Sequence, residues 1–397
     1  MHRPPRSAGL AVQIALVLAS ALLLFPTAAT AKPGLPSGST DDSVPGGLVV
    51  VIGNKAGQGL DLGALENPLI SGVALQIHWS DIEPVQGKPD WSKLDKLFAE
   101  ATSSKKWVQL LIFPGFFSPA WALERGAKTE QFPIQYGPVK GTVETLPMPW
   151  DEVYLTRWFA FLKQLSARYG KSPAFRMIAA AGPTSVSAEF TLPNNPQDHK
   201  KWLDDSYTPS KYIGAWQKVF QVYADYFPNQ YVSLSAPGLP ILVHPRQDSG
   251  ERMQARQEIL DQARGILGHR VALQWSDLHA GSVRDSDYLD FVVSNNGRII
   301  TGIQMKTSAE GSSGDMGAEG DPPLALRRSI DMGMQPNSAG QHVNYLEIYE
   351  ADVLADEMQP VLRYGASLFA PVKPSPRPRG SGDSPRPPNV AAARANR

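Results

Sequence analysis

Short apolar runs alternate with amphipathic segments from residue 47 to about residue 350. The runs are rich in Val, Ile and Leu and end at glycine, proline or polar residues, a pattern that predicts buried strands. We expect strands at 47–53, 70–78, 107–113, 174–181, 231–236, 271–275, 299–305 and 343–348.

The segments between these runs carry apolar residues at helical spacing. We expect helices at 91–100, 154–169, 212–226, 254–267 and 324–332. Strand and helix in repeated alternation predict an α/β fold, a (β/α)8 TIM barrel spanning residues 47–370. An open doubly wound sheet is the alternative, and it usually shows a glycine-rich phosphate turn after an early strand. Residues 53–59 (GNKAGQG) lack the spacing of that turn, so we interpret them as a loop.

The first 31 residues have the pattern of a secretory signal peptide. Arg3 and Arg6 precede an apolar run at 8–25, and Ala29-Thr30-Ala31 matches a small-residue cleavage site. An uncleaved membrane anchor is the alternative, because the run is close to the length that spans a bilayer. Cleavage predicts a secreted or periplasmic protein without stable membrane insertion, in which residues 32–46 form a linker.

The C-terminal segment and the composition limit the classes of protein to which this chain can belong. Residues 371–397 are rich in Pro, Gly, Ser and Arg, which predicts a disordered basic tail that either contacts anionic polymers or is merely solvated. The 397 residues include no cysteine, so a disulfide scaffold, a lipid-modified cysteine and a thiolate metal site are excluded. With 38 basic and 38 acidic residues, a basic nucleic-acid-binding surface is not expected.

In a TIM barrel the active site lies at the C-terminal ends of the strands. Glu189 and Glu347 each follow an apolar run at that end, and each has an aromatic residue nearby. Cleaving a glycosidic bond needs two carboxyl groups, one protonated as the acid and one ionised as the nucleophile or base. The sequence therefore predicts these two glutamates as the catalytic pair of a carbohydrate-cleaving site. Solvated loop charges or ion pairs are the alternative interpretation.

Further polar and aromatic residues gather at the same ends and suit a sugar, which has apolar faces and many hydroxyls. The tryptophans are either platforms for a sugar ring or core residues, and the histidine either contacts sugar or is hydrogen-bonded at the core edge. The predicted substrate-binding residues are His78, Trp79, Trp121, Trp275, Asp277, Gln304 and Tyr349.

Other hydrolytic chemistries have weaker support. Asp277 and His279 form an Asp-x-His pair that could bind a metal, but the remaining histidines are scattered, so we expect no metal and no cofactor. No Gly-x-Ser-x-Gly nucleophile elbow occurs in the sequence.

The stretch from Ser71 to Trp121 resembles the front of clan A glycoside hydrolase barrels, especially the β-galactosidase-like and family 5-like groups. The matching residues are Trp79, Ile82-Glu83-Pro84, Gly87, Asp90-Trp91, Leu94-Asp95 and Pro119-Ala120-Trp121. The resemblance implies a retaining enzyme in which Glu189, after the fourth strand, is the acid/base and a second glutamate is the nucleophile.

Two positions depart from the clan pattern. Ala188 replaces the asparagine that precedes the acid/base, and Gln304 stands at the end of the seventh strand, where the clan carries its nucleophile. Glu347, on the eighth strand, would then serve as the nucleophile. These departures leave a second hypothesis open, a carbohydrate-binding pseudoenzyme on the same barrel.

Overall fold

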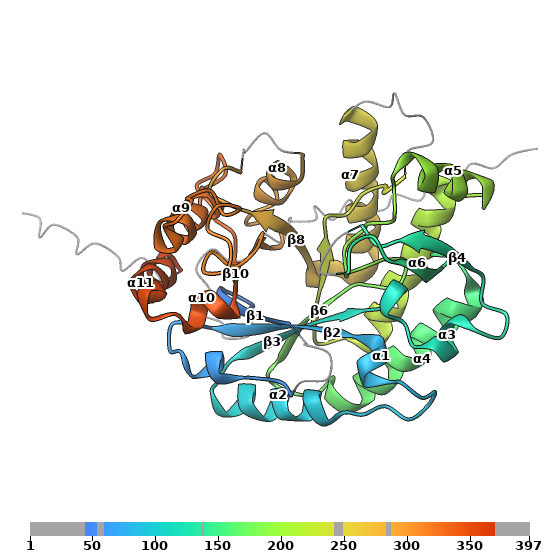
Figure 1. The fold of residues 1–397 in the computed structure, drawn as a ribbon, viewed down its shortest axis with the longest axis horizontal. Coiled ribbons are helices and arrows are strands. Elements are labelled where there is room, and N and C mark those ends of the chain that lie inside the picture. The colour runs from blue at the N-terminus through green and yellow to red at the C-terminus, as the bar shows by residue number, and fades with distance from the viewer. Residues whose placement is uncertain (1–43, 54–58, 136–138, 242–248, 283–286, 370–397) are drawn as a thin grey trace, which may run out of the picture. The chain divides into compact units, whose positions relative to one another are not determined.

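The computed structural model describes residues 44–53, 59–135, 139–241, 249–282 and 287–369. Within these ranges eight parallel strands close into a barrel in the order β1-β10-β9-β8-β7-β6-β3-β2 (Figure 1). Each strand lies at a predicted position, so the (β/α)8 barrel predicted from the sequence is confirmed. The barrel strands are β1 Gly47–Gly53, β2 Gly72–His78, β3 Trp107–Phe113, β6 Phe175–Ala179, β7 Tyr231–Ser235, β8 Val271–Leu278, β9 Ile300–Met305 and β10 Tyr345–Tyr349.

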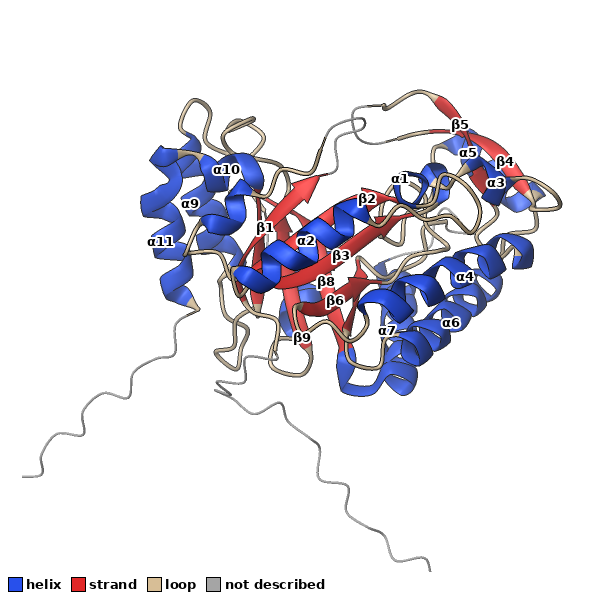
Figure 2. Ribbon diagram, turned by 90° about the horizontal axis from the view of Figure 1, so that it is seen from below, coloured by secondary structure: helices blue, strands red, loops and turns tan. Residues whose placement is uncertain are grey.

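Helices surround the barrel, and α4, α6 and α7 lie side by side on its outside (Figure 2). The helices are α1 Trp79–Ile82, α2 Ser92–Ser103, α3 Ala120–Leu123, α4 Glu152–Tyr169, α5 Pro196–Asp204, α6 Pro209–Tyr226, α7 Ser249–Leu267, α8 Asp287–Ser294, α9 Pro322–Gly333, α10 Glu350–Leu354 and α11 Gln359–Leu368. Short 3₁₀ helices lie at Gly63–Glu66, Gly115–Phe117, Gly268–Arg270 and Asp356–Met358.

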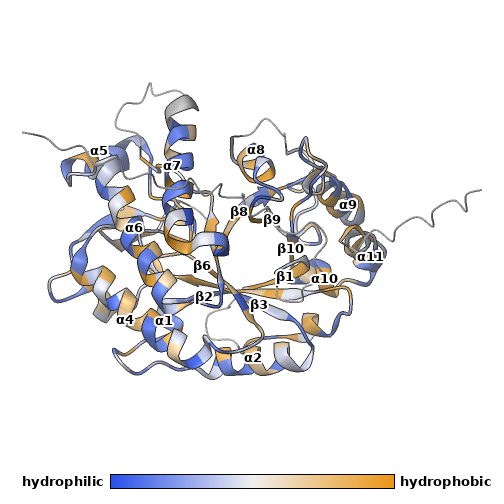
Figure 3. Cartoon of the chain, turned by 180° about the vertical axis from the view of Figure 1, so that it is seen from behind, coloured by the Kyte–Doolittle hydropathy of each residue, from blue (hydrophilic) through white to orange (hydrophobic). Residues whose placement is uncertain are grey.

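The helices are held to the barrel by their apolar faces, while their polar faces point outward (Figure 3). Helix α4 shows how the sequence achieves this. Asp151 caps its first turn by accepting a hydrogen bond from the Tyr154 N–H at 2.8 Å. Tyr154 and Trp158, one turn apart, are then both fully buried against the barrel.

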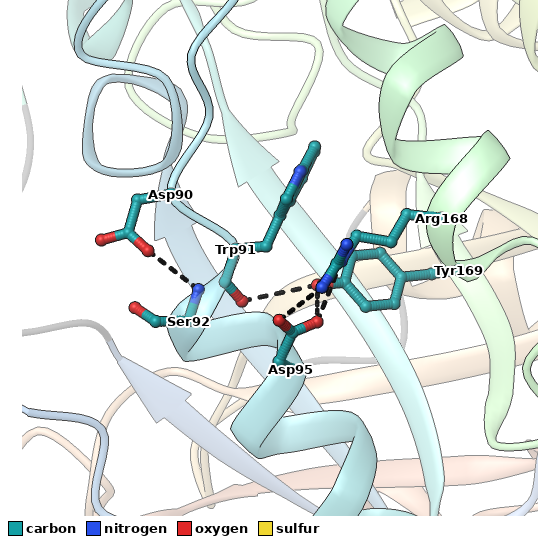
Figure 4. Close-up of polar contacts among 6 residues, drawn as sticks. All are labelled: Asp90, Trp91, Ser92, Asp95, Arg168 and Tyr169. Carbon is teal, nitrogen blue, oxygen red and sulfur yellow. Dashed lines mark hydrogen bonds and ion pairs between the residues drawn. The ribbon is translucent and has the colours of Figure 1, made fainter.

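A polar cluster joins α2 to α4 (Figure 4). Asp90 accepts a hydrogen bond from the backbone N–H of Ser92 at 2.9 Å, where α2 begins. One helical turn later, Asp95 forms an ion pair with Arg168 at 2.6 Å and accepts from the hydroxyl of Tyr169 at 2.7 Å. The Arg168 guanidinium lowers the pKa of Asp95. Asp90 and Asp95, which carry part of the clan A resemblance, therefore have structural roles here.

Two glycines make room for large rings inside the barrel. A Cβ atom on Gly302 would lie 2.0 Å from Cζ of Tyr345, and one on Gly72 would lie 2.5 Å from the indole of Trp107. The rings of Trp107 and Tyr345 meet edge to face with centroids 5.8 Å apart. These rings fill the interior of the barrel at the N-terminal ends of β3 and β10.

A hairpin outside the barrel, β4 Thr129–Pro133 paired with β5 Val143–Pro147, was not predicted. It packs against α5, where Phe132 stacks on Trp202 with ring centroids 4.4 Å apart.

Several predicted segments lie outside the described residues: the signal peptide at 1–31, most of the linker at 32–46, most of the loop at 53–59 and the tail at 371–397. Among the described residues, no helix combines the length and apolar character needed to cross a membrane.

Candidate functional site

Inward-pointing side chains at the C-terminal half of the barrel form a continuous polar network. In parallel strands alternate residues face the interior, and register pairs Glu347 of β10 with Gln304 of β9. Gln274 of β8 pairs with Ser235 of β7. Contacts between these four strands therefore bring the residues around Glu347 and those around Glu189 to one mouth of the barrel.

Glu347 lies at the centre of this network and is fully buried. Its Oε2 accepts a hydrogen bond from Nε2 of Gln274 at 2.8 Å. Its Oε1 has no hydrogen-bond partner among the described residues. Burial penalises the charged carboxylate, and it raises the pKa of Glu347 to about 8 although the bond from Gln274 opposes the shift. Glu347 is therefore mostly protonated at neutral pH.

The orientation of the Gln274 amide is fixed by two further bonds. Its Oε1 accepts from Nε2 of Gln109 at 2.9 Å and from the hydroxyl of Tyr345 at 3.0 Å. Because the oxygen faces two donors, the amide nitrogen must face Glu347. Gln274 thus presents a preset donor to one oxygen of the carboxyl group.

Glu189 approaches the same mouth from the loop after β6. It forms an isolated parallel bridge with Ser235, whose Oγ lies 3.4 Å from Oε1 of Glu189. The Ser235 hydroxyl also contacts the Ser276 hydroxyl at 3.2 Å, and both hydroxyls interact with the carboxyl group. The pKa of Glu189 is raised, mainly by desolvation, and the nearby charge of Asp277 adds to the shift. Unlike Glu347, Glu189 is partly exposed.

Tyr349 connects the two carboxyl groups electrostatically. Its hydroxyl accepts from Nε2 of Gln304 at 2.8 Å, and Oε1 of Gln304 accepts from Gln76 at 3.3 Å. Burial raises the pKa of Tyr349 to about 12, and the charges of Glu347 and Glu189 both contribute. Since Gln304 already donates to the phenol oxygen, the phenol proton is available to another acceptor at the mouth. Glu189, Glu347, Gln304 and Tyr349 therefore share one site.

His78 lies at the rim of the barrel mouth, at the end of β2. Its ring stacks on Phe117 with centroids 3.8 Å apart and planes inclined by 3°. Its Nδ1 lies 3.5 Å from Asp81. Desolvation lowers the pKa of His78 despite the opposing effect of Asp81, so the ring is neutral at pH 7. Its role in sugar binding stays a prediction.

The prediction that Trp79 and Trp121 are sugar platforms is wrong for Trp79. Trp79 is fully buried, and its indole donates to Glu83 at 3.1 Å. Trp121 meets it edge to face at 5.4 Å and donates to the carbonyl of Glu83 at 2.9 Å. Trp158 closes the other side of Trp79, so no face of this indole is left for a ligand. Trp121 belongs to the same aromatic cluster and not to the network around Glu347.

Trp275 and Asp277 differ in their relation to the network. Alternation along β8 places Trp275 on the opposite side of the strand from Gln274, partly buried against the core. Asp277 is exposed but lies close enough to Glu189 to raise the pKa of Glu189.

The Asp277 and His279 pair is not part of a metal site in the described residues. Nδ1 of His279 accepts a hydrogen bond from the Gly281 N–H at 3.1 Å within a turn. In the described part of the chain, no three His, Asp or Glu side chains gather as a metal site requires.

Sequence reasoning missed Gln274, Gln109 and Gln76, which build the polar interior. Each lies inside an apolar strand run, in the segments VALQW, WVQLLIF and ALQIH. A buried strand with one amide among aliphatic residues must satisfy that amide inside the barrel, because buried polar groups are hydrogen-bonded. A single glutamine within each apolar run was thus the sequence feature from which the polar network could have been predicted.

Comparisons with known proteins support the fold. Comparison with protein-family models found no match, and comparison with curated proteins found none either. Among solved structures, the catalytic domain of β-amylase from Paenibacillus polymyxa superposes with a TM-score of 0.50 at 10% identity. The match covers 83% of this chain and 100% of that chain. At this identity the similarity shows only the fold. The fold and the strand order place this chain in the structural class of (β/α)8 barrels.

Proposed function

We propose that this protein is an exported glycoside hydrolase that cleaves O-glycosidic bonds in an oligo- or polysaccharide through Glu189 and Glu347. The observation that carries the proposal is the linked arrangement of the two carboxyl groups at the barrel mouth. Ser235 contacts Glu189, Gln274 holds Glu347, and Tyr349 lies within electrostatic reach of both. The similar solved structure is itself the catalytic domain of a glycosidase, a β-amylase.

The proposed mechanism is retaining double displacement. Glu189, whose raised pKa favours the protonated acid, donates its proton to the glycosidic oxygen as the bond to the anomeric carbon breaks. Glu347 attacks the anomeric carbon as a carboxylate and forms the glycosyl ester. Glu189 then takes a proton from water, which attacks the anomeric carbon and releases Glu347.

Glu347 must be ionised to attack, although its pKa is about 8. The Gln274 amide, and the Tyr349 hydroxyl if its proton turns toward the carboxylate, would stabilise that ionised form. Activity therefore depends on a population with Glu347 ionised and Glu189 protonated, and the two groups titrate as a coupled pair. We expect a bell-shaped pH dependence of kcat/KM, with its maximum between the two pKa values of the coupled pair.

Trapping of the covalent intermediate tests the mechanism. An activated 2-deoxy-2-fluoro glycoside of a sugar that the enzyme cleaves should label the peptide containing Glu347. In the trapped complex the two carboxyl groups should lie about 5 to 5.5 Å apart. Label on a different carboxyl group, or a separation far beyond 10 Å, contradicts the mechanism.

Export is tested separately by determining the N-terminus of the protein recovered outside the cytoplasm. Cleavage after Ala31 gives a mature chain that begins at Lys32.

A second function, carbohydrate binding without catalysis, is favoured by one observation. The fully buried Glu347 is mostly neutral at pH 7, and a neutral carboxyl group is a poor nucleophile. This alternative predicts measurable oligosaccharide affinity with no turnover across pH 5 to 9. Release of product from any aryl glycoside that depends on Glu189 and Glu347 excludes it.

A further inference from the structure

A cavity of about 440 Å³ begins at the residue after Glu189. Its walls come from three loops or helices that follow barrel strands at the same end as the candidate catalytic pair. Phe190 and Thr191 follow Glu189, Gly238 and Ile241 follow β7, and Arg252 and Arg256 come from α7. This volume lies in the range of small-molecule pockets.

One wall of the cavity is rigid. Phe190 is almost fully buried and stacks on Trp216 of α6, with ring centroids 3.6 Å apart and planes inclined by 10°. Because Phe190 is bonded directly to Glu189, this stack fixes the position of the cavity relative to the carboxyl group.

Two arginines lie among the described residues that line the cavity. Arg256 is only 2% exposed, and its guanidinium lies 3.7 Å from the ring centroid of Tyr288, which also lines the cavity. Arg252 lies one helical turn earlier and is exposed. The described lining residues include no Asp or Glu. Arg252 and Arg256 thus bring two guanidinium groups to the cavity, and a planar guanidinium suits anionic oxygen pairs.

Two further features leave space and a polar contact for a ligand. Nε2 of His199 is buried at the cavity and has no hydrogen-bond partner among the described residues. Gly238 has no side chain, and a Cβ atom there would lie 3.5 Å from Cγ of Arg256 and 3.7 Å from the Tyr288 hydroxyl. The glycine therefore keeps the surface beside Arg256 open.

We propose that this cavity is a subsite for a sugar that carries an anionic group, a carboxylate or a sulfate, so that the substrate is an acidic polysaccharide. Arg256 and Arg252 bind the anionic oxygens, His199 contributes a ring nitrogen, and Phe190 and Tyr288 provide apolar surface. The inference rests on the proposed carbohydrate function and adds the substrate class to it.

Binding measurements on the full mature chain test the subsite. The probes are tetrasaccharides of galacturonate, mannuronate and hyaluronan and one sulfated carrageenan, each compared with its carboxyl-reduced or desulfated counterpart. Calorimetry on Glu189→Gln measures affinity without turnover, and the wild type measures hydrolysis. We expect at least one acidic probe to bind about tenfold or more tightly than its neutral counterpart, which is the size expected for hydrogen bonds to a charged group. Whether a uronate or the sulfated probe shows the preference identifies the anionic group.

Three variants, each made in the Glu189→Gln background, test whether the cavity residues cause the preference for acidic over neutral probes. Arg252→Gln should lower the ratio of acidic to neutral affinity about tenfold. Gly238→Leu should abolish acidic binding by filling the cavity. Arg264→Gln, an exposed arginine on the same helix, is the matched control and should leave the ratio unchanged.

The outcomes separate this proposal from the proposed function. Neutral and acidic probes that bind equally, or an equal loss of preference in Arg264→Gln, overturn the subsite while hydrolysis stands. Acidic preference that depends on Arg252, without turnover by the wild type, supports the subsite and contradicts the hydrolase. Failure of every probe to bind overturns the subsite and leaves the hydrolase to be decided by hydrolysis of aryl glycosides.

Discussion

The side-chain amide of Gln274 donates to Oε2 of Glu347 at 2.8 Å, while its oxygen accepts from Gln109 and Tyr345. Glu347 is fully buried and accepts one hydrogen bond from a donor of fixed orientation. That hydrogen bond does not offset the cost of desolvating the carboxylate, so the pKa of Glu347 is raised. This balance makes the protonation of Glu347 the feature that most strongly controls the candidate site.

Glu347 should make stability depend on pH. Its pKa is about 8 in the folded protein, whereas an ordinary glutamate has a pKa of 4.5, so between these values the folded state retains the proton that the unfolded state releases. Its stabilising contribution is fully present below pH 4.5 and is lost as the pH rises to about 8. Glu347→Gln lacks this titration. The free energy of unfolding of the wild type, relative to that of the variant, should therefore fall between pH 4.5 and 8 in urea denaturation. A pH-independent difference contradicts the raised pKa.

Tyr349→Phe should impair the proposed catalysis and leave the fold intact. The variant removes a phenol that accepts from Gln304 and lies near both carboxyl groups. Loss of one preorganised donor typically costs about 10²-fold or more in kcat. The pH profile of kcat/KM should also shift upward, because Glu347 becomes harder to ionise. Tyr364→Phe, which removes a hydroxyl bonded to Asp331 on the outer helices, is the control and should change neither quantity.

Trp79→Phe should lower stability and not substrate affinity. The indole is buried between Trp121 and Trp158 and donates to Glu83, so the variant loses packing and one hydrogen bond. We expect a loss of about 1–3 kcal/mol in the free energy of unfolding. KM should stay within twofold of the wild type. A large rise in KM with unchanged stability would restore the sequence-based interpretation of Trp79 as a sugar platform.

Gly302→Ala should strongly destabilise the barrel. The added Cβ would lie 2.0 Å from Cζ of Tyr345, which is fully buried, so the ring or the strand would have to shift. Overpacking of this kind typically costs about 1–3 kcal/mol or more. Gly214→Ala is the matched control, because it lies within α6 with no atom near the new Cβ. That control should be neutral or stabilising by up to about 1 kcal/mol. Equal effects of the two changes in urea denaturation argue against the packing around Tyr345.

The barrel strands could be predicted because each is a continuous apolar run, as a strand buried on both faces requires. The hairpin of β4 and β5 was missed because its segments, TEQFP and VETLP, are short, are mixed in polarity and end in proline. Its stability comes from a distant partner, Trp202 of α5, which no local pattern reveals.

The site was only partly predictable for a similar reason. Fold topology brings strand ends together, so the positions of Glu189 and Glu347 followed from the barrel itself. The burial of Trp79 depends on Trp121 and Trp158, which lie far away in the sequence. Gln274 is placed among apolar neighbours, and its importance appears only when its three partners on other strands are known.

The most direct test of the central proposal is hydrolysis of a panel of 4-nitrophenyl glycosides, neutral and acidic, by the wild type and by Glu189→Gln and Glu347→Gln. Glu310→Gln, which changes an exposed glutamate after β9, is the control. We predict turnover by the wild type and the control, and a loss of about 10³-fold or more in both site variants, with unchanged circular dichroism. Wild-type turnover that survives in both site variants would contradict the assignment of Glu189 and Glu347 as the catalytic pair.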